Sequence, residues 1–501
     1  MAKNFKKSLV KNSFWGFTSS LANRVGGLIF TIILARFLFT ERFGVYTLVI
    51  STAMIFFTFA DLGINSTLVR YLSKAIQEDK TKVSSYYRYL LKLKLIFVIT
   101  ASFLLLILAY PISIYVYKNA QLLIPLIVAA IYIIVLSFEN FYTQIFYAIE
   151  KVDYTTFKEF LHQVLRICFT LFVIFVVASS YHVTGIFLGL ILTAIIILIV
   201  VIYYTKKLIP SLYEKPKQRI DKKRVKVFLG FLTIASISAI FFSYIDTIML
   251  GIFVSPEFVG LYRASFSLVF GITGLVSFSN TIFLSVFTKL KKSNISFVLN
   301  KAFKYLSIIS IPSVFGLLIL GKYFVKLFYG ITYIDSTLSL SILTLLIFPT
   351  VSIGLFLSLF SAEEKPQIFA KLIIATTIIN IILNVTLIKI FLKISPLWAT
   401  FGAGLATVIS WIFYFVASIF AIKKLKFNLN IKQLTTPIIS AIIMSGVLIF
   451  YLRDIQDMNF ALGVLSVLIG LIVYAVSIFL IDKDLREDLK EFKSLFNLKL
   501  K

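Results

Sequence analysis

The sequence predicts an all-α integral membrane protein with about fourteen transmembrane helices. The chain has 501 residues, of which 59% are hydrophobic, and its mean hydropathy is +0.98. Only 14% of the residues are charged, and the clusters that they form are separated by apolar runs of about 20 residues, the length that a helix needs to cross a bilayer. A soluble fold cannot keep so much apolar surface from water. Because the helices and short loops account for the whole length, no sizeable soluble domain is expected.

The apolar runs place each helix along the chain. The predicted helices cover 13–36, 43–65, 89–110, 121–147, 157–180, 183–204, 227–253, 257–288, 302–320, 334–360, 368–392, 399–422, 433–451 and 461–481. The run 257–288 is longer than a crossing needs, so this helix is expected to tilt or to protrude. The first run contains Arg24 and lacks a clear small-residue cleavage site, so we expect a retained helix rather than a signal peptide.

The distribution of Lys and Arg predicts which loops face the cytoplasm. The great majority of the 50 basic residues fall at both ends of the chain and in loops on one side of the predicted topology. Basic residues accumulate in cytoplasmic loops, so we expect a multi-pass protein of the cell membrane with both termini in the cytoplasm. The net charge of +28 is explained by these basic cytoplasmic loops, so no nucleic-acid partner is expected.

An internal repeat predicts two six-helix lobes related by an axis along the membrane normal, a parallel arrangement typical of transporters. TIILARFLFTERFGVY at 31–46 aligns without a gap with TIMLGIFVSPEFVGLY at 247–262, and AIEK at 148–151 aligns with AEEK at 362–365 at nearly the same offset. The predicted organisation is an N-lobe over 1–204, a basic linker over 205–226, a C-lobe over 227–422, two extra helices over 423–482 and a tail over 483–501. The tail places Leu485, Leu489, Phe492 and Phe496 on one helical face, so it is expected to lie on the inner membrane surface.

Several features argue against an enzyme. One cysteine, Cys168, excludes an internal disulfide framework, and with His162 and His182 it forms no metal-ligand cluster. The sequence has no phosphate-cradling Gly-rich loop, no C-x-x-C and no G-x-S-x-G, so no catalytic residue, metal or cofactor is expected. The predicted outer loops are all short, whereas an extracytoplasmic polymerase or ligase usually needs a catalytic loop there.

Several strings resemble the polysaccharide and oligosaccharide flippases, including the O-antigen type, of the multidrug/oligosaccharidyl-lipid/polysaccharide exporter superfamily. They are ILARFLFTERFGVYTLV at 33–49, DLGINSTLVRYLSK at 61–74, YIDTIMLGIFVSPEFVGLYRASFSL at 244–268, NIILNVTLIKIF at 380–391 and WATFGAGLATVIS at 398–410. The resemblance implies a MATE-like fold with two lobes around a central cavity, and alternating access. It also implies a polyprenyl-diphosphate-linked oligosaccharide as substrate, with a glycan polymerase or other assembly proteins as possible partners.

Arg24 is the first candidate for substrate binding. It lies near the membrane midplane on the first helix, with no acidic residue one turn away and with Gly26-Gly27 beside it as a possible bending point. A charge at this depth is costly and needs a cavity or a partner. We expect Arg24 to hold the substrate diphosphate, because Arg makes forked bonds to phosphate. The alternative is an ion pair between helices.

Arg263 and Asp246 lie on adjacent helices joined by a short outer turn. One interpretation is an ion pair that closes this hairpin. The other places Arg263 against the substrate, while Asp246 carries a coupling Na⁺ or H⁺.

Further charges within the spans give weaker candidates. Glu159, His162 and Arg166 share one helical face, either as a strip that contacts substrate or as a structural cluster. Lys92 and Lys94 can snorkel to the headgroups, and Lys92 is kept as a substrate-binding candidate.

Asp61 and Glu139 lie at a similar depth on two helices, where they can bind a coupling cation or close a gate by hydrogen bonds. Asn380 and Asn384 share a face and are expected to bond between helices. Pro312, Pro349 and Pro437 lie within spans and free backbone carbonyls.

The leading functional hypothesis is therefore a flippase that moves a lipid-diphosphate-linked oligosaccharide from the inner to the outer leaflet for surface polysaccharide or glycan assembly. The first alternative is a multidrug or organic-cation exporter of the same superfamily, whose substrate would favour acidic cavity residues, whereas Arg24 and Arg166 are basic. The second is a membrane glycosyltransferase or polymerase, which would need a carboxylate site near a sizeable loop.

Overall fold

The structure is a computed structural model that describes residues 2–216, 218, 220–276, 280–455 and 459–488. Throughout these ranges the regular secondary structure is helical, without a β-strand. Eleven segments in the described part of the chain are long and apolar enough to cross a membrane, and the first of them, Phe14–Glu78, is long enough to cross more than once. The predicted all-α membrane class is confirmed.

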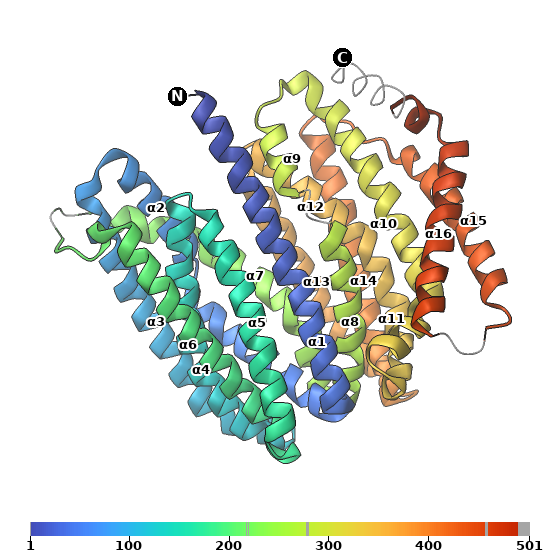
Figure 1. The fold of residues 1–501 in the computed structure, drawn as a ribbon, viewed down its shortest axis with the longest axis horizontal. Coiled ribbons are helices and arrows are strands. Elements are labelled where there is room, and N and C mark those ends of the chain that lie inside the picture. Colours follow the sequence, from blue (N-terminus) through green and yellow to red (C-terminus); the bar gives the residue numbers. More distant parts are fainter. Residues whose placement is uncertain (1, 217, 219, 277–279, 456–458, 489–501) are drawn as a thin grey trace. The chain divides into compact units, whose positions relative to one another are not determined.

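The chain forms sixteen α-helices within the described ranges (Figure 1). The first six are α1 (Ala2–Asp61), α2 (Ile64–Glu78), α3 (Val83–Pro111), α4 (Leu123–Ala148), α5 (Val152–Val176) and α6 (His182–Leu208). The next five are α7 (Lys222–Phe253), α8 (Pro256–Val276), α9 (Asn280–Phe287), α10 (Lys292–Phe328) and α11 (Thr337–Leu343). The last five are α12 (Ile347–Ala362), α13 (Pro366–Leu392), α14 (Pro396–Lys424), α15 (Thr435–Leu452) and α16 (Phe460–Ile481).

The observed helices match the predicted ones with four differences, one of which is that the predicted helix 334–360 is divided into α11 and α12. The first two predicted helices are the halves of α1, separated by a kink at Phe39, whose φ of 58° is not helical. The short helix α2 follows Gly63, whose φ is 79°, a backbone conformation that glycine adopts without strain. The predicted run 257–288 corresponds to α8 and α9, and its residues 277–279 lie outside the described ranges. Most of the predicted tail, including Leu489, Phe492 and Phe496, also lies outside them.

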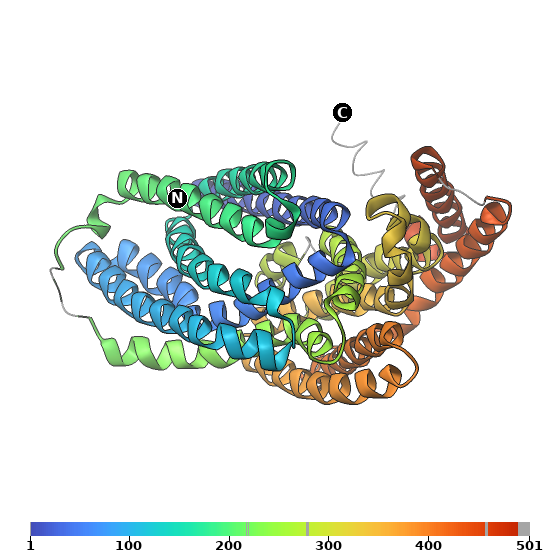
Figure 2. The same cartoon turned by 90° about the horizontal axis from the view of Figure 1, so that it is seen from below.

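The chain divides into two compact units. The first unit comprises Met1–Ser267 and Gln367–Ser410, and the second comprises Leu268–Pro366 and Trp411–Lys501. In the first unit α1 packs against α5, α3 packs against α4, and α4 packs against α6 (Figure 1). In the second unit α15 and α16 lie side by side, which Figure 2 also shows, and α10 packs against α12 and α15. The predicted lobe boundaries at 204 and 226 stay a prediction.

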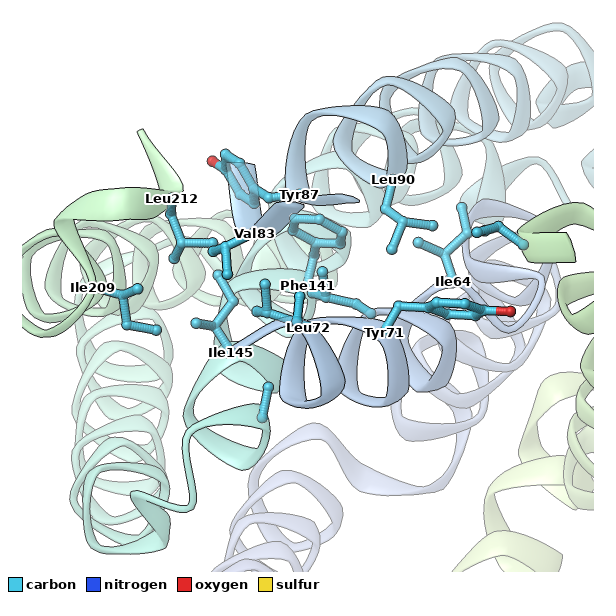
Figure 3. Packing of buried hydrophobic residues seen from close by; sticks show 14 residues of the cluster. Ile64, Tyr71, Leu72, Val83, Tyr87, Leu90, Phe141, Ile145, Ile209 and Leu212 are labelled. Atoms are coloured by element: carbon cyan, nitrogen blue, oxygen red, sulfur yellow. The ribbon is translucent and has the colours of Figure 1, made fainter. Parts of the chain in front are cut away.

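The amphipathic helix α2 is anchored by a cluster of buried apolar side chains (Figure 3). Its apolar face, including Leu72, packs against Val83 and Leu90 of α3 and against Phe141 and Ile145 of α4. Burying one such side chain contributes about 1.5–3 kcal/mol. The cluster therefore fixes α2 on the ends of α3 and α4.

Two glycines of the sequence repeat pack reciprocally. A Cβ at Gly44 would collide with the backbone of Pro256, and a Cβ at Gly260 would collide with the backbone of Thr40. In the repeat alignment Gly44 corresponds to Gly260 and Thr40 corresponds to Pro256. Each copy therefore uses the same glycine against the same position of the other copy, as a two-fold relation requires.

In the second unit α16 is bonded to a proline-interrupted helix. Pro312 lies inside α10 and has no N–H, so the carbonyl of Ile308 one turn earlier lacks its helical donor. The Tyr474 hydroxyl of α16 donates to this oxygen at 2.8 Å. Pro312 and Tyr474 also line an apolar groove of about 520 Å³ formed mainly by α10, α15 and α16.

Candidate functional site

The structure leaves Arg24 without a carboxylate partner in the part of the chain that it describes. The side chain is exposed, and its Nε donates to Ser20 Oγ at 3.3 Å on the same helix. Gly26 packs tightly against Gln163 of α5. Arg24 and Gly26 are two positions apart, which is about 200° around a helix, so Arg24 lies on the face of α1 opposite α5. The alternative of an interhelical ion pair for Arg24 is therefore wrong for the described residues.

Arg263 lies on α8 against aromatic rings rather than against an acid. Its guanidinium carbon is 4.7 Å from the ring centre of Phe266 and 5.7 Å from that of Tyr244. Its Nη1 is buried and has no hydrogen-bond acceptor among the described residues. The predicted alternative of an ion pair with Asp246 is therefore wrong, because Asp246 has other partners.

Asp246 lies in a cage of uncharged donors. Its carboxylate accepts hydrogen bonds from Thr407 Oγ1 at 2.6 Å, from Asn384 Nδ2 at 2.8 Å and from Tyr262 Oη at 3.1 Å. These residues come from α14, α13 and α8, so four helices of the first unit meet at the α7 carboxylate. Asp246 is only 4% exposed, and Asn384 Oδ1 and Asn380 Nδ2 beside it are buried without a partner among the described residues.

The Asp246 cage combines the chemistry of a hard-cation site with charge that is not compensated. Carboxylate, amide and hydroxyl oxygens are the ligands that hard cations prefer. No Lys or Arg pairs with Asp246 in the described ranges, so the buried negative charge favours either a bound cation or a proton. The expectation that Asn384 bonds between helices is confirmed, and its partner is Asp246.

Arg166 ends a polar chain that runs along α5. Glu139 of α4 accepts from Lys158 Nζ at 2.8 Å, and Lys158 Nζ is 3.5 Å from Glu159 Oε2. Gln163 donates to Glu159 Oε1 at 2.7 Å and accepts from the Arg166 guanidinium. The arrangement favours a structural network over a free strip, and Gln163 is the connecting residue that sequence reasoning missed.

Aromatic side chains of α1 lie beside Arg166. The ring of the buried Tyr46 is 6.3 Å from the ring of Phe30, measured between ring centres. The Arg166 guanidinium also lies over the Phe30 ring of α1, with its carbon 4.1 Å from the ring centre. The spacing of Phe30 from Arg166 gives no sequence signal, because the two residues come from different helices, α1 and α5.

The remaining candidates separate into a paired and an unpaired group. Lys94 is 0% exposed and donates to Asp61 Oδ1 at 2.9 Å, so the expectation that Lys94 snorkels is wrong. Asp61 is therefore charge-compensated. Lys92 is exposed two positions away on α3. The structure does not bring Lys92 together with Arg24 or Arg263.

The described residues contain no cluster of three or more His, Cys, Asp and Glu side chains that could hold a metal ion. The first unit instead offers guanidinium groups without carboxylate partners, aromatic side chains and one caged carboxylate. Such groups can bind a phosphorylated ligand and a small cation.

The sequence profile of the family described as polysaccharide biosynthesis protein matches residues 9–291. This match covers more than half of the chain, so the chain belongs to that family.

A curated relative is the probable low-salt glycan biosynthesis flippase Agl15 of Haloferax volcanii, which is 27% identical over 283 residues. The match covers 54% of this chain and 56% of that protein, so the chain spans little more than half the length of this relative.

Two similar solved structures confirm the predicted MATE-like fold. The lipid II flippase MurJ in its inward closed conformation has a TM-score of 0.72 at 19% identity, with 95% of this chain and 99% of that chain covered. An inward-facing multidrug resistance MATE family transporter of the MOP superfamily has a TM-score of 0.59 at 12% identity, with 83% and 95% covered. At these identities the likeness shows the fold alone.

Proposed function

We propose that the protein is a flippase that moves a lipid-diphosphate-linked oligosaccharide from the inner to the outer leaflet by alternating access. The family match and the glycan flippase relative support this substrate class. The observation that carries the proposal is the set of guanidinium groups without carboxylate partners in the first unit, at Arg24 and Arg263.

An uncompensated guanidinium within a membrane helix is costly unless it meets water or an anion. A diphosphate supplies planar acceptor edges that match the forked N–H groups of Arg. Arg24 and Arg263 bind the diphosphate, Lys92 contacts the substrate at another point, and Arg166 belongs to the structural network of α5. Tyr244, half-buried beside Arg263, offers a ring for the first sugars.

The lipid part of the substrate requires an apolar path. The groove of the second unit has this character, since its lining between α10, α15 and α16 is almost entirely aliphatic and aromatic. A polyprenyl chain gains free energy by leaving water along such a surface, at about 25 cal/mol per Å². The groove therefore has the character needed to contact part of the polyprenyl chain.

The Asp246 cage couples transport to a Na⁺ or H⁺ gradient. Occupation by a cation or a proton neutralises the carboxylate that the cage otherwise leaves uncompensated. Asp61 joins α1 to α3 through Lys94 and acts as a gate residue, and Glu139 joins α4 to α5 through Lys158 and acts as a structural residue.

The flippase resides in the cell membrane with both termini in the cytoplasm, and the glycan then passes to a polymerase or other assembly proteins. It performs no covalent step and needs no resident cofactor.

Translocation in reconstituted vesicles tests the proposal. Purified protein is placed in liposomes with a fluorescent polyprenyl-diphosphate oligosaccharide, and the fraction accessible to an external lectin is followed over time. Wild-type protein is expected to expose the glycan, whereas Arg24→Ala abolishes exposure without loss of inserted protein. Arg453→Ala, an exposed arginine after α15, is the matched control and keeps the wild-type rate.

An organic fluorescent cation in the same vesicles separates the proposal from a multidrug exporter. Export of the cation without movement of the glycan lipid would overturn the flippase assignment.

A further inference from the structure

A polar pocket of about 240 Å³ lies in the first unit, away from the groups assigned to transport. It forms where the last turns of α2, the start of α3 and the first turn of α7 meet. Its lining includes Arg70, Lys74, Lys82 and Arg224, with the tyrosines Tyr71 and Tyr86. We call it the α2–α7 pocket.

The three acids of the α2–α7 pocket are already engaged. Asp79 accepts from the Thr81 amide at 3.1 Å and lies 3.0 Å from Lys82 Nζ. Glu78 lies 3.5 Å from Lys74 Nζ, one turn earlier on α2. These two ion pairs compensate the charges of Lys74 and Lys82.

The third acid, Asp221, is the N-terminal cap of α7 and accepts from the Arg224 amide at 3.0 Å. The carboxylate is directed to the backbone of the helix, where the helix dipole favours it. The Asp221 carboxylate bonds to the Arg224 backbone rather than to its side chain, and the Arg224 guanidinium has no acid partner in the described part of the chain.

The lining holds four basic and three acidic side chains, a net charge of +1, and the two guanidinium groups are its cations without an ion-pair partner among the described residues. Arg70 lies over the Phe228 ring of α7, with its guanidinium carbon 4.2 Å from the ring centre. Arg224 is held beside α2 because the Tyr71 hydroxyl donates to its carbonyl oxygen at 3.3 Å.

We propose that the α2–α7 pocket binds a phosphate group between Arg70 and Arg224. Two forked donors can each take two oxygens of one phosphate. Basic pockets between membrane helices are sites for anionic lipid headgroups, and free phosphate esters have the same acceptor chemistry. The proposal is independent of the transported substrate, because none of the residues assigned to transport lines this pocket.

Ligand binding to the purified full chain in neutral detergent micelles tests the proposal. Phosphatidylglycerol binding is measured by native mass spectrometry, and inorganic phosphate and glycerol phosphate binding by calorimetry. The double variant Arg70→Gln with Arg224→Gln is expected to bind the preferred probe about tenfold or more weakly, because hydrogen bonds to charged groups are lost. The double variant Lys223→Gln with Lys226→Gln makes the same charge change on exposed residues outside the pocket and is expected to stay within about twofold of wild type.

The probes distinguish the source of the phosphate. Binding of phosphatidylglycerol alone assigns the site to a lipid headgroup, and binding of the soluble esters as well assigns it to a free phosphate ligand. Arg70→Lys with Arg224→Lys keeps the charge but removes the forks, and it is expected to bind weakly as well. The proposal would be overturned if Arg70→Gln with Arg224→Gln lost no more affinity than Lys223→Gln with Lys226→Gln. It would also be overturned if the wild-type protein bound none of the probes. Thermal midpoints without ligand establish that each variant is folded.

Discussion

Two buried carboxylates of the first unit have opposite surroundings. Glu139 on α4 is 1% exposed and is held by the Lys158 ammonium group at 2.8 Å. Asp246 on α7 is 4% exposed, and its partners among the described residues are uncharged: a hydroxyl of Thr407, a phenol of Tyr262 and an amide of Asn384. Both acids look alike in the sequence, since each stands alone in an apolar run.

The difference indicates which buried charges support the fold and which can work in transport. A compensated carboxylate is satisfied in every state that keeps its ion pair, so it stabilises one arrangement of helices. An uncompensated carboxylate changes its environment whenever a cation or proton arrives, so it can bias an equilibrium between two arrangements. We therefore expect Glu139 to matter for stability and Asp246 to matter for coupling.

The largest expected effect is on stability at the Glu139–Lys158 pair. Lys158→Met alone leaves the buried Glu139 carboxylate without its partner and is expected to cost about 3–5 kcal/mol of unfolding free energy, and Glu139→Gln is expected to cost less, because Lys158 Nζ stays 3.5 Å from Glu159. The double variant removes both charges of the pair and is expected to lose less than the sum of the two single losses, although Glu159 also loses its contact with Lys158. Thermal unfolding in detergent measures the cycle, and additive losses in the double variant would contradict compensation.

Asp246→Asn is expected to remove ion-driven transport while leaving the fold intact. The amide keeps the size of the side chain but can neither carry the negative charge nor release a proton. Coupling energies of about 1–3 kcal/mol correspond to changes of about 5–150-fold, so the gradient-driven translocation rate should fall by about 100-fold. The rate is compared with and without a Na⁺ or H⁺ gradient, and a variant that still responds to either gradient speaks against coupling at Asp246.

A smaller effect is expected from the hydroxyl of Thr407. Thr407→Val keeps the shape and removes a donor to the carboxylate, which contributes about 1.5–3 kcal/mol. Without this donor the empty, ionised carboxylate is less stable, so the cation or proton that neutralises it binds more tightly and the cation concentration for half-maximal transport is expected to fall roughly tenfold. Thr407→Ser retains the hydroxyl and serves as the control; similar shifts in both variants would exclude the hydrogen bond as the cause.

The smallest effect concerns a compensated acid outside the membrane spans. Asp482 follows α16, and although burial opposes its ionisation, hydrogen bonds from Lys304 at 2.7 Å and from the Leu485 amide at 2.9 Å lower its pKa. A lowered pKa adds stability that is present above the unfolded value of about 3.9 and is lost as the pH falls through the folded value.

The helical turn 483–488 is therefore expected to loosen only below about pH 4. Amide hydrogen exchange of Leu485 reports this change as a falling protection factor. Asp482→Asn should make the protection independent of pH in this range, and an unchanged pH profile in that variant would assign the effect to another group.

The sequence predicts the helices well because length and hydropathy decide them locally. It also locates Arg24 and Asp246 as costly charges within spans, since the cost depends on depth alone. The reciprocal packing of Gly44 and Gly260 agrees with the repeat read from the alignment.

The partners of those charges could not be predicted, because they come from helices far apart in the chain. The spacing of Asp246 and Arg263 suggested a hairpin ion pair, yet Asn384 and Thr407 of later helices hold the acid instead. Likewise, Lys94 is directed to Asp61 rather than to the headgroups. The partner of each buried charge depends on which helix faces meet, and a single sequence does not show which faces these are.

Translocation under a cation gradient, measured side by side in two variants, tests the account most directly. The double variant Glu139→Gln with Lys158→Met should flip the glycan lipid and respond to the gradient as wild type does, because Glu159 keeps its Gln163 partner. Asp246→Asn should insert normally and lose the response. A gradient response that survives in Asp246→Asn and disappears in the double variant would contradict the account.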